Sequence, residues 1–354
     1  MTAIPIHTDA VIVGAGPVGL FQAFQLGLQD IRCHIIDALP HAGGQCVELY
    51  ADKPIYDIPG IPMCTGRELV AQLQTQIKPF APTFHIDQEV TQVTRLDDGC
   101  LSVHTSAQQH FICKTLFVAA GVGAFQARKL AVEGALNLEG THLHYRLGDV
   151  SRFAGQDVLV LGGEASAVAA ALQLTLAAQT NANAPCKGPR SVTLMHRRDV
   201  FQAEPMLLQA MRDAVAGGTL QLQIGQPTSL LATEGQLHTL QIATPDGHTV
   251  DRPVQQLVAF LGLSPKLGPI ANWGLAMERK QLVVNTENFA TDVPGIFAVG
   301  DINTYPGKKK LILCGFHEAT LAAFGAAAIV HPARKTLLQY TTTSTELHRL
   351  LGLV

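Results

Sequence analysis

The sequence lacks three features that would each indicate a particular class of protein. Its 354 residues contain no Cys-x-x-Cys pair, and the seven scattered cysteines favour single thiols in a reduced compartment over a disulfide framework or a metal site. A formal net charge of only −3 argues against nucleic acid or an anionic membrane as the main partner. The most apolar runs, 167–178 and 321–330, are shorter than a membrane-spanning helix requires.

The N-terminal segment also lacks a targeting pattern. It carries His7 and Asp9 and has neither the basic start nor the apolar run of a signal peptide, so we expect a cytoplasmic protein. A hydrophobic content of 47% is ample for a packed core. The length of the chain favours two domains.

A glycine-rich turn near the N-terminus is the first feature that indicates a chemistry. An apolar strand over 10–13 leads into a turn and a predicted helix, and the turn contains Gly14, Gly16, Pro17 and Gly19. Gly14 permits a tight turn, Gly16 lets backbone amides approach a pyrophosphate, and Gly19 allows close packing of helix and strand. Asp37 ends the next strand, where a carboxylate accepts hydrogen bonds from a ribose. The pattern predicts a dinucleotide site.

A second unit of the same kind begins near residue 155. It comprises an apolar strand, a glycine turn, an alanine-rich helix and a second strand, namely 158–161, Gly162-Gly163, a helix from Ser166, and 191–196. Arg197 and Arg198 follow directly, where NAD enzymes usually place an acidic residue. Guanidinium groups match the 2′-phosphate of NADP, so this position favours NADP, although an arginine pair elsewhere is usually solvated charge.

Two further glycine motifs lie outside these units. A buried strand over 296–299 ends in Gly300-Asp301, and Gly43-Gly44-Gln45 would let the backbone approach a flat ring. Alone, each is more often an ordinary turn. Together with the first unit they imply one flavin site built from distant segments, with the second unit inserted between them. Other strands are expected over 90–94, 101–105, 111–118, 220–224, 237–242, 254–260 and 282–284.

These residues resemble the thioredoxin-reductase-like ferredoxin–NADP reductases, from near Asp9 to the C-terminus. The matching stretches are the first glycine turn over 14–19, 43–50, 55–60, 121–125, 196–199, 300–302 leading into 305–308, and 315–319. The most family-specific are Tyr305-Pro306-Gly307-Lys308 and Gly315-Phe316-His317-Glu318-Ala319. The glycine turns alone would fit many flavoproteins.

The resemblance implies a fold and a function. The fold is α/β, with two doubly wound Rossmann-like domains of the three-layer ββα type. The expected FAD-binding domain is discontinuous, over 1–122 and 281–354 with a C-terminal extension, and the expected NADPH-binding domain covers 123–280. A homodimeric enzyme would accept hydride from NADPH at FAD and pass single electrons to ferredoxin or flavodoxin.

The resemblance also implies roles for individual residues. Asp37 holds the FAD ribose, and Gln45 and Asp301 hold the flavin end. The expected catalytic residues are Tyr50, which stacks on the isoalloxazine, and Tyr340, which covers its other face from the C-terminal extension. Further cofactor contacts are expected at Val90, Phe125 and Thr342, and at Gly162, Gly163, Ser166, Ala167, Arg197 and Arg198.

One departure from the family pattern leaves alternatives open. The family usually has Gly-Gly-Gly-Asp-Ser-Ala at the second turn, and here Glu164 and Ala165 replace the third glycine and the acid. A carboxylate beside a pyrophosphate costs on the order of 1 kcal/mol in water, so Glu164 either points to solvent or the helix begins one residue differently. A flavin-bound redox sensor with an impaired NADPH site therefore remains an alternative.

A second alternative is a thioredoxin-reductase-like flavoprotein with another acceptor. Thioredoxin reductase chemistry needs a Cys-x-x-Cys pair in the nicotinamide domain, where the nearest cysteine is the single Cys186. Cys46 lacks the partner of lipoamide-dehydrogenase-like enzymes, because Ala51 stands five positions later. Electrons are thus expected to leave the flavin directly. Lys308-Lys309-Lys310 is either a solvated face or a docking patch for an acidic ferredoxin.

Overall fold

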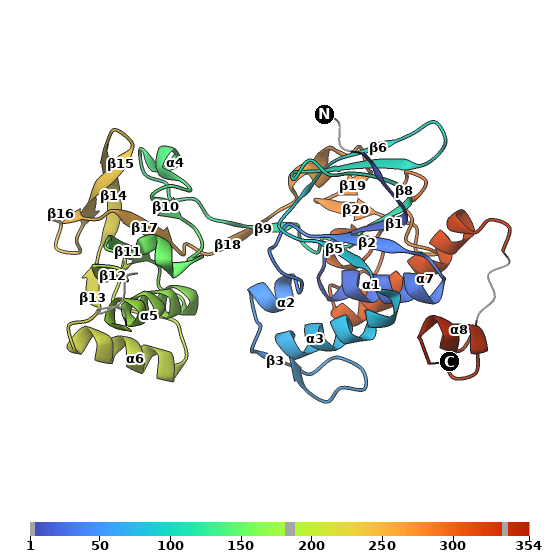
Figure 1. Ribbon diagram of the computed structural model, residues 1–354, viewed down its shortest axis with the longest axis horizontal. Coiled ribbons are helices and arrows are strands. Elements are labelled where there is room, and N and C mark those ends of the chain that lie inside the picture. The colour runs from blue at the N-terminus through green and yellow to red at the C-terminus, as the bar shows by residue number, and fades with distance from the viewer. Residues whose placement is uncertain (1–3, 181–187, 335–338, 354) are drawn as a thin grey trace. The chain divides into compact units, whose positions relative to one another are not determined.

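The computed structural model describes residues 4–180, 188–334 and 339–353. The chain forms two compact units (Figure 1). Unit 1 comprises Met1–Ala124 and Pro265–Val354, and unit 2 comprises Phe125–Ser264. Where the chain passes between the units, β9 (Ala124–Ala127) pairs with β18 (Leu263–Lys266).

Unit 1 is built on a mixed sheet with the strand order β5-β2-β1-β8-β7-β6. Its strands are β1 (Ile6–Val13), β2 (Cys33–Ile36), β5 (Thr83–His85), β6 (Val90–Arg95), β7 (Leu101–Thr105), β8 (His110–Val118) and β21 (Ile296–Ala298). β5, β2, β1 and β8 run parallel, and β7 and β6 continue antiparallel. β21 pairs in parallel with the C-terminal half of β8, so a late segment of the chain completes the sheet of the first unit.

Helices α1 (Pro17–Leu28), α3 (Gly66–Gln76) and α7 (Ile312–Val330) pack around this sheet, with α1 against both α3 and α7. The shorter elements of unit 1 are α2 (Gln45–Glu48), β3 (Pro54–Ile55), β4 (Cys64–Thr65), η1 (Lys78–Phe80), η3 (Gly268–Asn272), β19 (Met277–Glu278), β20 (Gln281–Val283), η4 (Gly300–Ile302), β22 (Asn303–Thr304) and α8 (Thr345–Leu350). Because Thr65 and Glu68 form a reciprocal capping box, α3 begins directly after β4.

The apolar run predicted over 321–330 is the second half of α7. By length and composition alone, α7 could cross a membrane. However, Glu318 and alanines such as Ala322 and Ala326 have no exposed surface in unit 1, and α7 packs along α1. A core helix of a soluble protein meets the same criterion, and the buried face of α7 contributes to the core of unit 1.

Unit 2 has a fully parallel sheet with the strand order β10-β17-β11-β12-β13. These strands are β10 (Leu143–His144), β11 (Asp157–Leu161), β12 (Ser191–His196), β13 (Gln221–Ile224) and β17 (Gln256–Ala259). The other elements are α4 (Ala135–Leu138), η2 (Val150–Phe153), α5 (Ala165–Thr180), α6 (Pro205–Ala216) and the antiparallel strands β14 (Gln226–Thr233), β15 (Gln236–Ala243) and β16 (Thr249–Pro253).

The three layers of unit 2 follow from the alternation of side chains along β11. Val158 and Val160 belong to the core that contains α5 and α6 residues. Leu159 and Leu161 belong to the core that contains β14 and β15 residues. Successive side chains of a strand point to opposite faces, so an uninterrupted apolar strand is buried on both sides. Helices thus cover one face and a β-meander the other.

The boundary between the units differs from the expected one. The predicted inserted domain covered 123–280, whereas unit 2 ends at Ser264. Residues 265–280 belong to unit 1 because η3 packs on β6, and Ile270 and Leu275 are buried in the core of unit 1.

Candidate cofactor sites

The turn between β1 and α1 has the geometry of a phosphate cradle. Gly14 has φ +111°, and a Cβ on it would lie 2.4 Å from the backbone oxygen of Ala119. A Cβ on Gly19 would lie 1.9 Å from the backbone oxygen of Gly14, so the helix packs on the strand only because both are glycine. A Cβ on Gly16, by contrast, meets nothing closer than the Cα of Gly44, at 3.9 Å.

The start of α1 is free to bind an anion. Gly16 is the N-cap residue, no side chain caps the helix, and the first turn carries no acidic residue. Unpaired N–H groups and the positive end of the helix dipole face the open space at Gly16. The turn therefore fits the pyrophosphate of a dinucleotide.

Three distant segments converge on this turn. The N–H of Gly43 donates to the backbone oxygen of Ala15 at 2.9 Å, which places the 43–45 loop beside the turn. Gln45 lies next to Gly121, whose Cβ would be 3.1 Å from the amide nitrogen of Gln45. A Cβ on Gly300 would lie 3.3 Å from the side chain of Val18 in α1. The structure thus brings Gln45 and the Gly300-Asp301 segment to the N-terminal end of α1.

Asp37 is fixed beside the same turn. Its Oδ2 accepts from the N–H of Ala15 at 2.6 Å and its Oδ1 from the N–H of Leu39 at 2.8 Å. Burial raises the pKa of the Asp37 carboxyl, although the two backbone donors act in the opposite direction. A carboxylate can accept more than two hydrogen bonds, so Asp37 can still receive those of a ribose.

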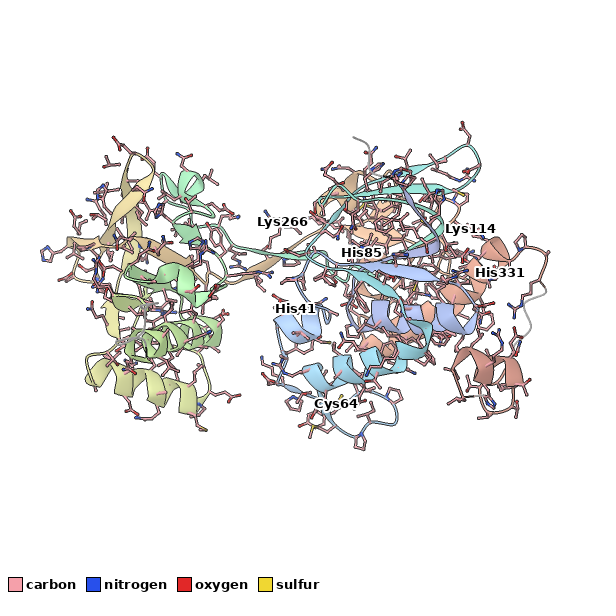
Figure 2. All side chains as sticks on the ribbon, in the orientation of Figure 1. His41, Cys64, His85, Lys114, Lys266 and His331 are labelled. Atoms are coloured by element: carbon pink, nitrogen blue, oxygen red, sulfur yellow. The ribbon has the colours of Figure 1, made fainter. Side chains whose placement is uncertain are left out.

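Tyr50 and Cys46 form a second part of this site. The Cys46 thiol donates to Oη of Tyr50 at 3.5 Å. Burial is the main cause that raises the pKa of both groups, and the nearby Asp301 carboxylate raises both further. Cys64, labelled in Figure 2, also raises the pKa of Cys46. The Tyr50 phenol and the Cys46 thiol are therefore held in their protonated forms at neutral pH.

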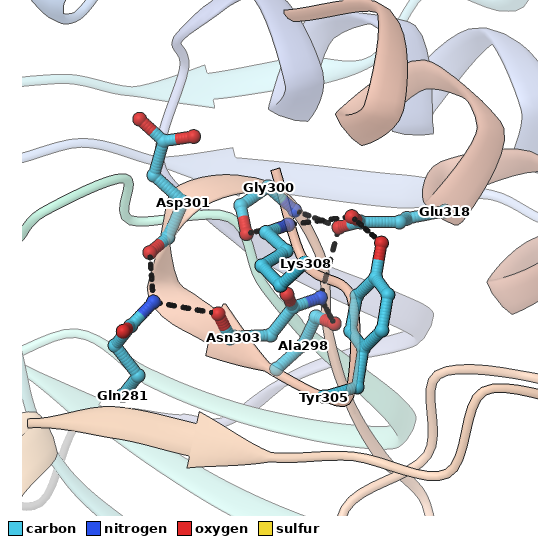
Figure 3. Close-up of polar contacts among 8 residues, drawn as sticks. All are labelled: Gln281, Ala298, Gly300, Asp301, Asn303, Tyr305, Lys308 and Glu318. Carbon is cyan, nitrogen blue, oxygen red and sulfur yellow. Dashed lines mark hydrogen bonds and ion pairs between the residues drawn. The ribbon is translucent and has the colours of Figure 1, made fainter. Parts of the chain in front are cut away.

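A buried network, which the sequence analysis did not predict, lies beneath Asp301 (Figure 3). Glu318 has no exposed surface and accepts from the N–H of Gly300 at 2.7 Å, the amide of Asn303 at 2.8 Å and Oη of Tyr305 at 2.9 Å. Lys308 forms an ion pair with Glu318 and donates to the backbone oxygen of Gly300 at 2.8 Å.

This network corrects the interpretation of the lysine run. The side chain of Lys308 is only 7% exposed, so it is neither a solvated charge nor part of a docking patch. Lys309 and Lys310 are exposed. The sequence signal that could have separated them is that Lys308 alone belongs to the Tyr-Pro-Gly-Lys motif.

The C-terminal extension lies at the opposite end of α1 from the glycine turn. His331 (Figure 2) contacts the backbone oxygen of Asp30 through Nε2 at 3.3 Å, and Arg334 lies 4.0 Å from the Asp30 carboxylate. Arg334 and Gln339 both bind Glu346. A helix of this length spans roughly 18 Å, so the tail is well separated from the turn of its own chain.

The remaining residues expected at the FAD site are placed as follows. Tyr340 is 66% exposed, and Thr342 is exposed in the turn before α8. Val90 is buried as the first residue of β6. Phe125 lies in β9, and its side chain is outside the described part of the structure. In unit 1 the structure gathers Asp37, Gln45, Tyr50 and Asp301 around the first turn, and it does not bring Tyr340 or Thr342 to them.

The second glycine turn, in unit 2, is shaped by His196. A Cβ on Gly163 would lie 2.5 Å from Cε1 of His196, so the imidazole lies directly against the turn. Nδ1 of His196 lies 2.9 Å from the backbone oxygen of Arg198, to which only a protonated Nδ1 can donate. His196 thereby ties the arginine segment to the turn, a role that the sequence analysis did not assign.

Glu164 points to solvent, as one of the two expected explanations required. Its side chain is exposed, while its backbone oxygen accepts from the N–H of Ala167 at 3.0 Å at the start of α5. Ser166 is exposed and Ala167 is fully buried, so Ala167 can contact a ligand only through its backbone. Arg197 and Arg198 are exposed, and no ion pair involves their guanidinium groups among residues 4–180, 188–334 and 339–353.

Comparisons with known proteins agree with this architecture. The family model for pyridine nucleotide-disulphide oxidoreductases matches residues 8–322. A ferredoxin–NADP reductase of Methylibium petroleiphilum is 55% identical over 98% of this chain and 93% of its own length. A ferredoxin–NADP reductase 2 of Cupriavidus metallidurans is 54% identical over 98% and 92%.

Solved structures share the fold at low identity. Thioredoxin reductase of Lactococcus lactis, in its FR conformation, has a TM-score of 0.55 and 23% identity, covering 91% of this chain and 99% of that one. The bacillithiol disulfide reductase of Staphylococcus aureus has a TM-score of 0.58 and 18% identity, covering 91% and 99%. Together with the parallel strands in the main sheet of each unit, these structures confirm the expected two-domain Rossmann-type fold.

Proposed function

We propose a function from the family to which the chain belongs: it is a pyridine nucleotide-disulphide oxidoreductase and, within that family, a ferredoxin–NADP reductase. The protein transfers hydride from NADPH to FAD, and then single electrons to ferredoxin or flavodoxin. FAD, when bound, supplies the exchange between two-electron and one-electron chemistry, and the protein supplies binding and orientation. The observation that carries the proposal is the convergence of Gln45, Tyr50 and Asp301 on an uncapped phosphate cradle.

Each part of unit 1 has a defined task in this proposal. The cradle of Gly14, Gly16, Pro17 and Gly19 takes the FAD pyrophosphate, and Asp37 accepts from the ribose. The Asp301 carboxylate and the Gln45 amide face the flavin end. Tyr50 packs on the ring through its phenol, which the buried Cys46 thiol holds in place. Val90, Phe125 and Thr342 stay predicted contacts of the cofactor.

NADPH is proposed to bind at the second turn, in unit 2. Gly162 and Gly163 take the pyrophosphate, with Ser166 and the backbone of Ala167 at the start of α5. Arg197 and Arg198 take the 2′-phosphate, because they are exposed, carry no ion pair within the described residues, and are tied to the turn by His196. Because its side chain is exposed, Glu164 is free to turn away from the pyrophosphate, and an impaired NADPH site stays the alternative.

Electrons leave the flavin without a cysteine relay. Unit 2 contains a single cysteine, Cys186, which lies outside the described residues, so a redox pair cannot form within that unit. Cys46 is buried, its pKa is raised, and its thiol is engaged with Tyr50. A protonated, buried thiol is a poor nucleophile. This arrangement distinguishes the chain from disulfide reductases.

A basic and partly apolar surface next to the flavin end is suited to bind the electron acceptor, ferredoxin or flavodoxin. Lys309 and Lys310 are exposed and directly follow Lys308, which is anchored beneath Asp301. Leu311 and Leu313 are 46% and 45% exposed. A basic surface with apolar residues attracts a small acidic electron carrier and makes its docking sensitive to salt.

A homodimer is proposed because the C-terminal extension lies away from the cradle of its own chain. Tyr340 is exposed and precedes α8, which contacts α1, and Arg334 before it lies at the Asp30 end of α1, whereas the cradle is at the other end of that helix. If Tyr340 covers a flavin, that flavin belongs to a second copy of the chain. The cytoplasmic location stays a prediction from the sequence.

The test of this function is direct. Purified protein is expected to bind FAD, and NADPH is expected to bleach the flavin absorbance rapidly in a stopped-flow instrument. Addition of oxidised ferredoxin should then restore the flavin absorbance while the ferredoxin is reduced. Flavin that stays oxidised with NADPH would refute the proposal.

A further inference from the structure

We propose that Gln281, Lys308 and Glu318 are positioning residues, which hold the backbone of Gly300 and Asp301 from two sides and so fix the Asp301 carboxylate at the flavin end. This inference rests on the proposed binding of FAD in unit 1. It assigns a role to the Tyr-Pro-Gly-Lys motif and to the fully buried Glu318, which have no other task in the proposed function.

On one side, the charged side chains of Glu318 and Lys308 bind the backbone of Gly300. The N–H of Gly300 donates to Oε2 of Glu318 at 2.7 Å, and its carbonyl oxygen accepts from Nζ of Lys308 at 2.8 Å. Both polar groups of one residue are thus bound by the two members of a buried ion pair. Hydrogen bonds with an ionised partner are about twice as strong as neutral ones. Gly300 also has φ +81°, a conformation that residues with a Cβ rarely adopt, so glycine suits this position.

On the other side, the neutral side chain of Gln281 binds the backbone of Asp301 and Asn303. Nε2 of Gln281 donates to the backbone oxygen of Asp301 at 3.2 Å and to that of Asn303 at 2.8 Å. Gln281 begins β20, which pairs with β22, and β22 begins two residues after Asp301, so Gln281 is part of a small sheet. Figure 3 shows Gln281 approaching from the side away from Glu318.

The Asp301 side chain is left free by this arrangement. Its carboxylate points away from the network in Figure 3, and within the described residues no hydrogen bond reaches it. A residue whose backbone is fixed and whose functional group is free is suited to contact a ligand. A contribution to the stability of the fold does not by itself explain the buried Lys308–Glu318 ion pair. Replacing a buried ion pair by apolar residues often leaves the stability of a protein unchanged.

Two variants separate positioning from folding. Gln281→Leu removes the neutral clamp and leaves the buried ion pair intact, whereas Glu318→Gln leaves Lys308 without its charged partner. Asp52→Asn, at the exposed ion pair with Arg67, is the matched control. For each full-length holoenzyme, the Tm at saturating FAD, the FAD dissociation constant from dilution, and the visible flavin spectrum are measured.

We expect Gln281→Leu to keep the Tm within a few degrees, to weaken FAD binding about tenfold and to shift the flavin bands. Glu318→Gln should lower the Tm and produce the same spectral shift, and Asp52→Asn should change none of the three. If Gln281→Leu and Glu318→Gln lower the Tm but keep the wild-type FAD affinity and spectrum, the residues are structural only and the inference is overturned. A wild-type protein that binds no FAD would instead refute the proposed function.

Discussion

At the scale of single residues, the two proposed nucleotide sites differ in the placement of their charged side chains, which are buried in one site and exposed in the other. Asp37 is buried and held by two backbone donors before any ligand arrives. Arg197 and Arg198 are exposed and bind no carboxylate among the described residues. A preorganised site suits a cofactor that stays bound, and an open pair of cations suits one that exchanges in each turnover.

The arginines are expected to select the nicotinamide. Arg197→Ala and Arg198→Ala should each lower kcat/KM for NADPH about tenfold, or about 1.4 kcal/mol, because a charge-assisted contact to the 2′-phosphate is lost. kcat/KM for NADH should stay within about twofold. Arg279→Ala, at a side chain 90% exposed in unit 1, serves as the control. Equal losses with both donors would contradict this role.

Cys46 is expected to be dispensable for electron transfer. Cys46→Ser keeps a donor to Tyr50 and removes the thiol, so ferredoxin reduction should stay within about threefold of wild type. The measurement is NADPH-dependent ferredoxin reduction by the FAD-loaded variant. Loss of that activity with FAD still bound would show that a thiol carries electrons.

Single residues also show which parts of the candidate sites could be predicted from the sequence and which could not. The predictions for Asp37 and Asp301 follow from motifs, because each stands at a fixed place after a strand, and the prediction for Tyr50 follows from the family resemblance. Lys308 does not, because its burial depends on Glu318, which is contributed by a different element. His196 is similar: its contact with Gly163 follows from the parallel pairing of β11 and β12, not from its neighbours in the sequence.

At the scale of elements, two glycines of the β1–turn–α1 unit are expected to have different roles, one in binding FAD and one in the packing of the fold. Gly16→Ala adds a Cβ to open space at φ −70°, so we expect a Tm near wild type and FAD affinity reduced at least tenfold. Gly19→Ala adds a Cβ 1.9 Å from a backbone oxygen and should destabilise the protein by roughly 1–3 kcal/mol. Thermal unfolding and FAD titration of both variants test this. Tight FAD binding by Gly16→Ala would show that the pyrophosphate does not lie at this turn.

Most elements could be predicted because their patterns are local. The apolar runs at 101–105 and 191–196 are β7 and β12, and the predicted helix at 17–26 is the first part of α1. The short elements were missed, such as η3 and the β19–β20–β22 sheet. Strands of two or three residues leave no periodic signal, and they form because distant segments pair.

At the scale of the whole molecule, the division into units follows from packing. The glycine motifs predict two dinucleotide units and an insertion. They do not predict that residues 265–280 return to unit 1, because that depends on the burial of Ile270 and Leu275 against β6. The position of the tail beside Asp30 depends likewise on Arg334 and His331 contacts across about 300 residues of sequence.

The proposed dimer can be tested by mixing variants. At an FAD concentration below its dissociation constant, Gly16→Ala should hold little FAD but carry an intact tail, and Tyr340→Ala should bind FAD without its covering ring. If the tail serves the partner, unfolded and refolded mixtures should contain flavin with the wild-type spectrum, which neither variant shows alone. A monomer by light scattering, or flavin that never regains that spectrum, would contradict the proposal.

The central claim is that FAD is the only redox centre and that it takes its electrons from NADPH. Anaerobic titration with NADPH, followed by flavin absorbance, counts the electrons taken up by each FAD. The account predicts full reduction by one equivalent of NADPH, since no disulfide accepts a further pair. Uptake of two equivalents would reveal a redox-active thiol pair and contradict the account.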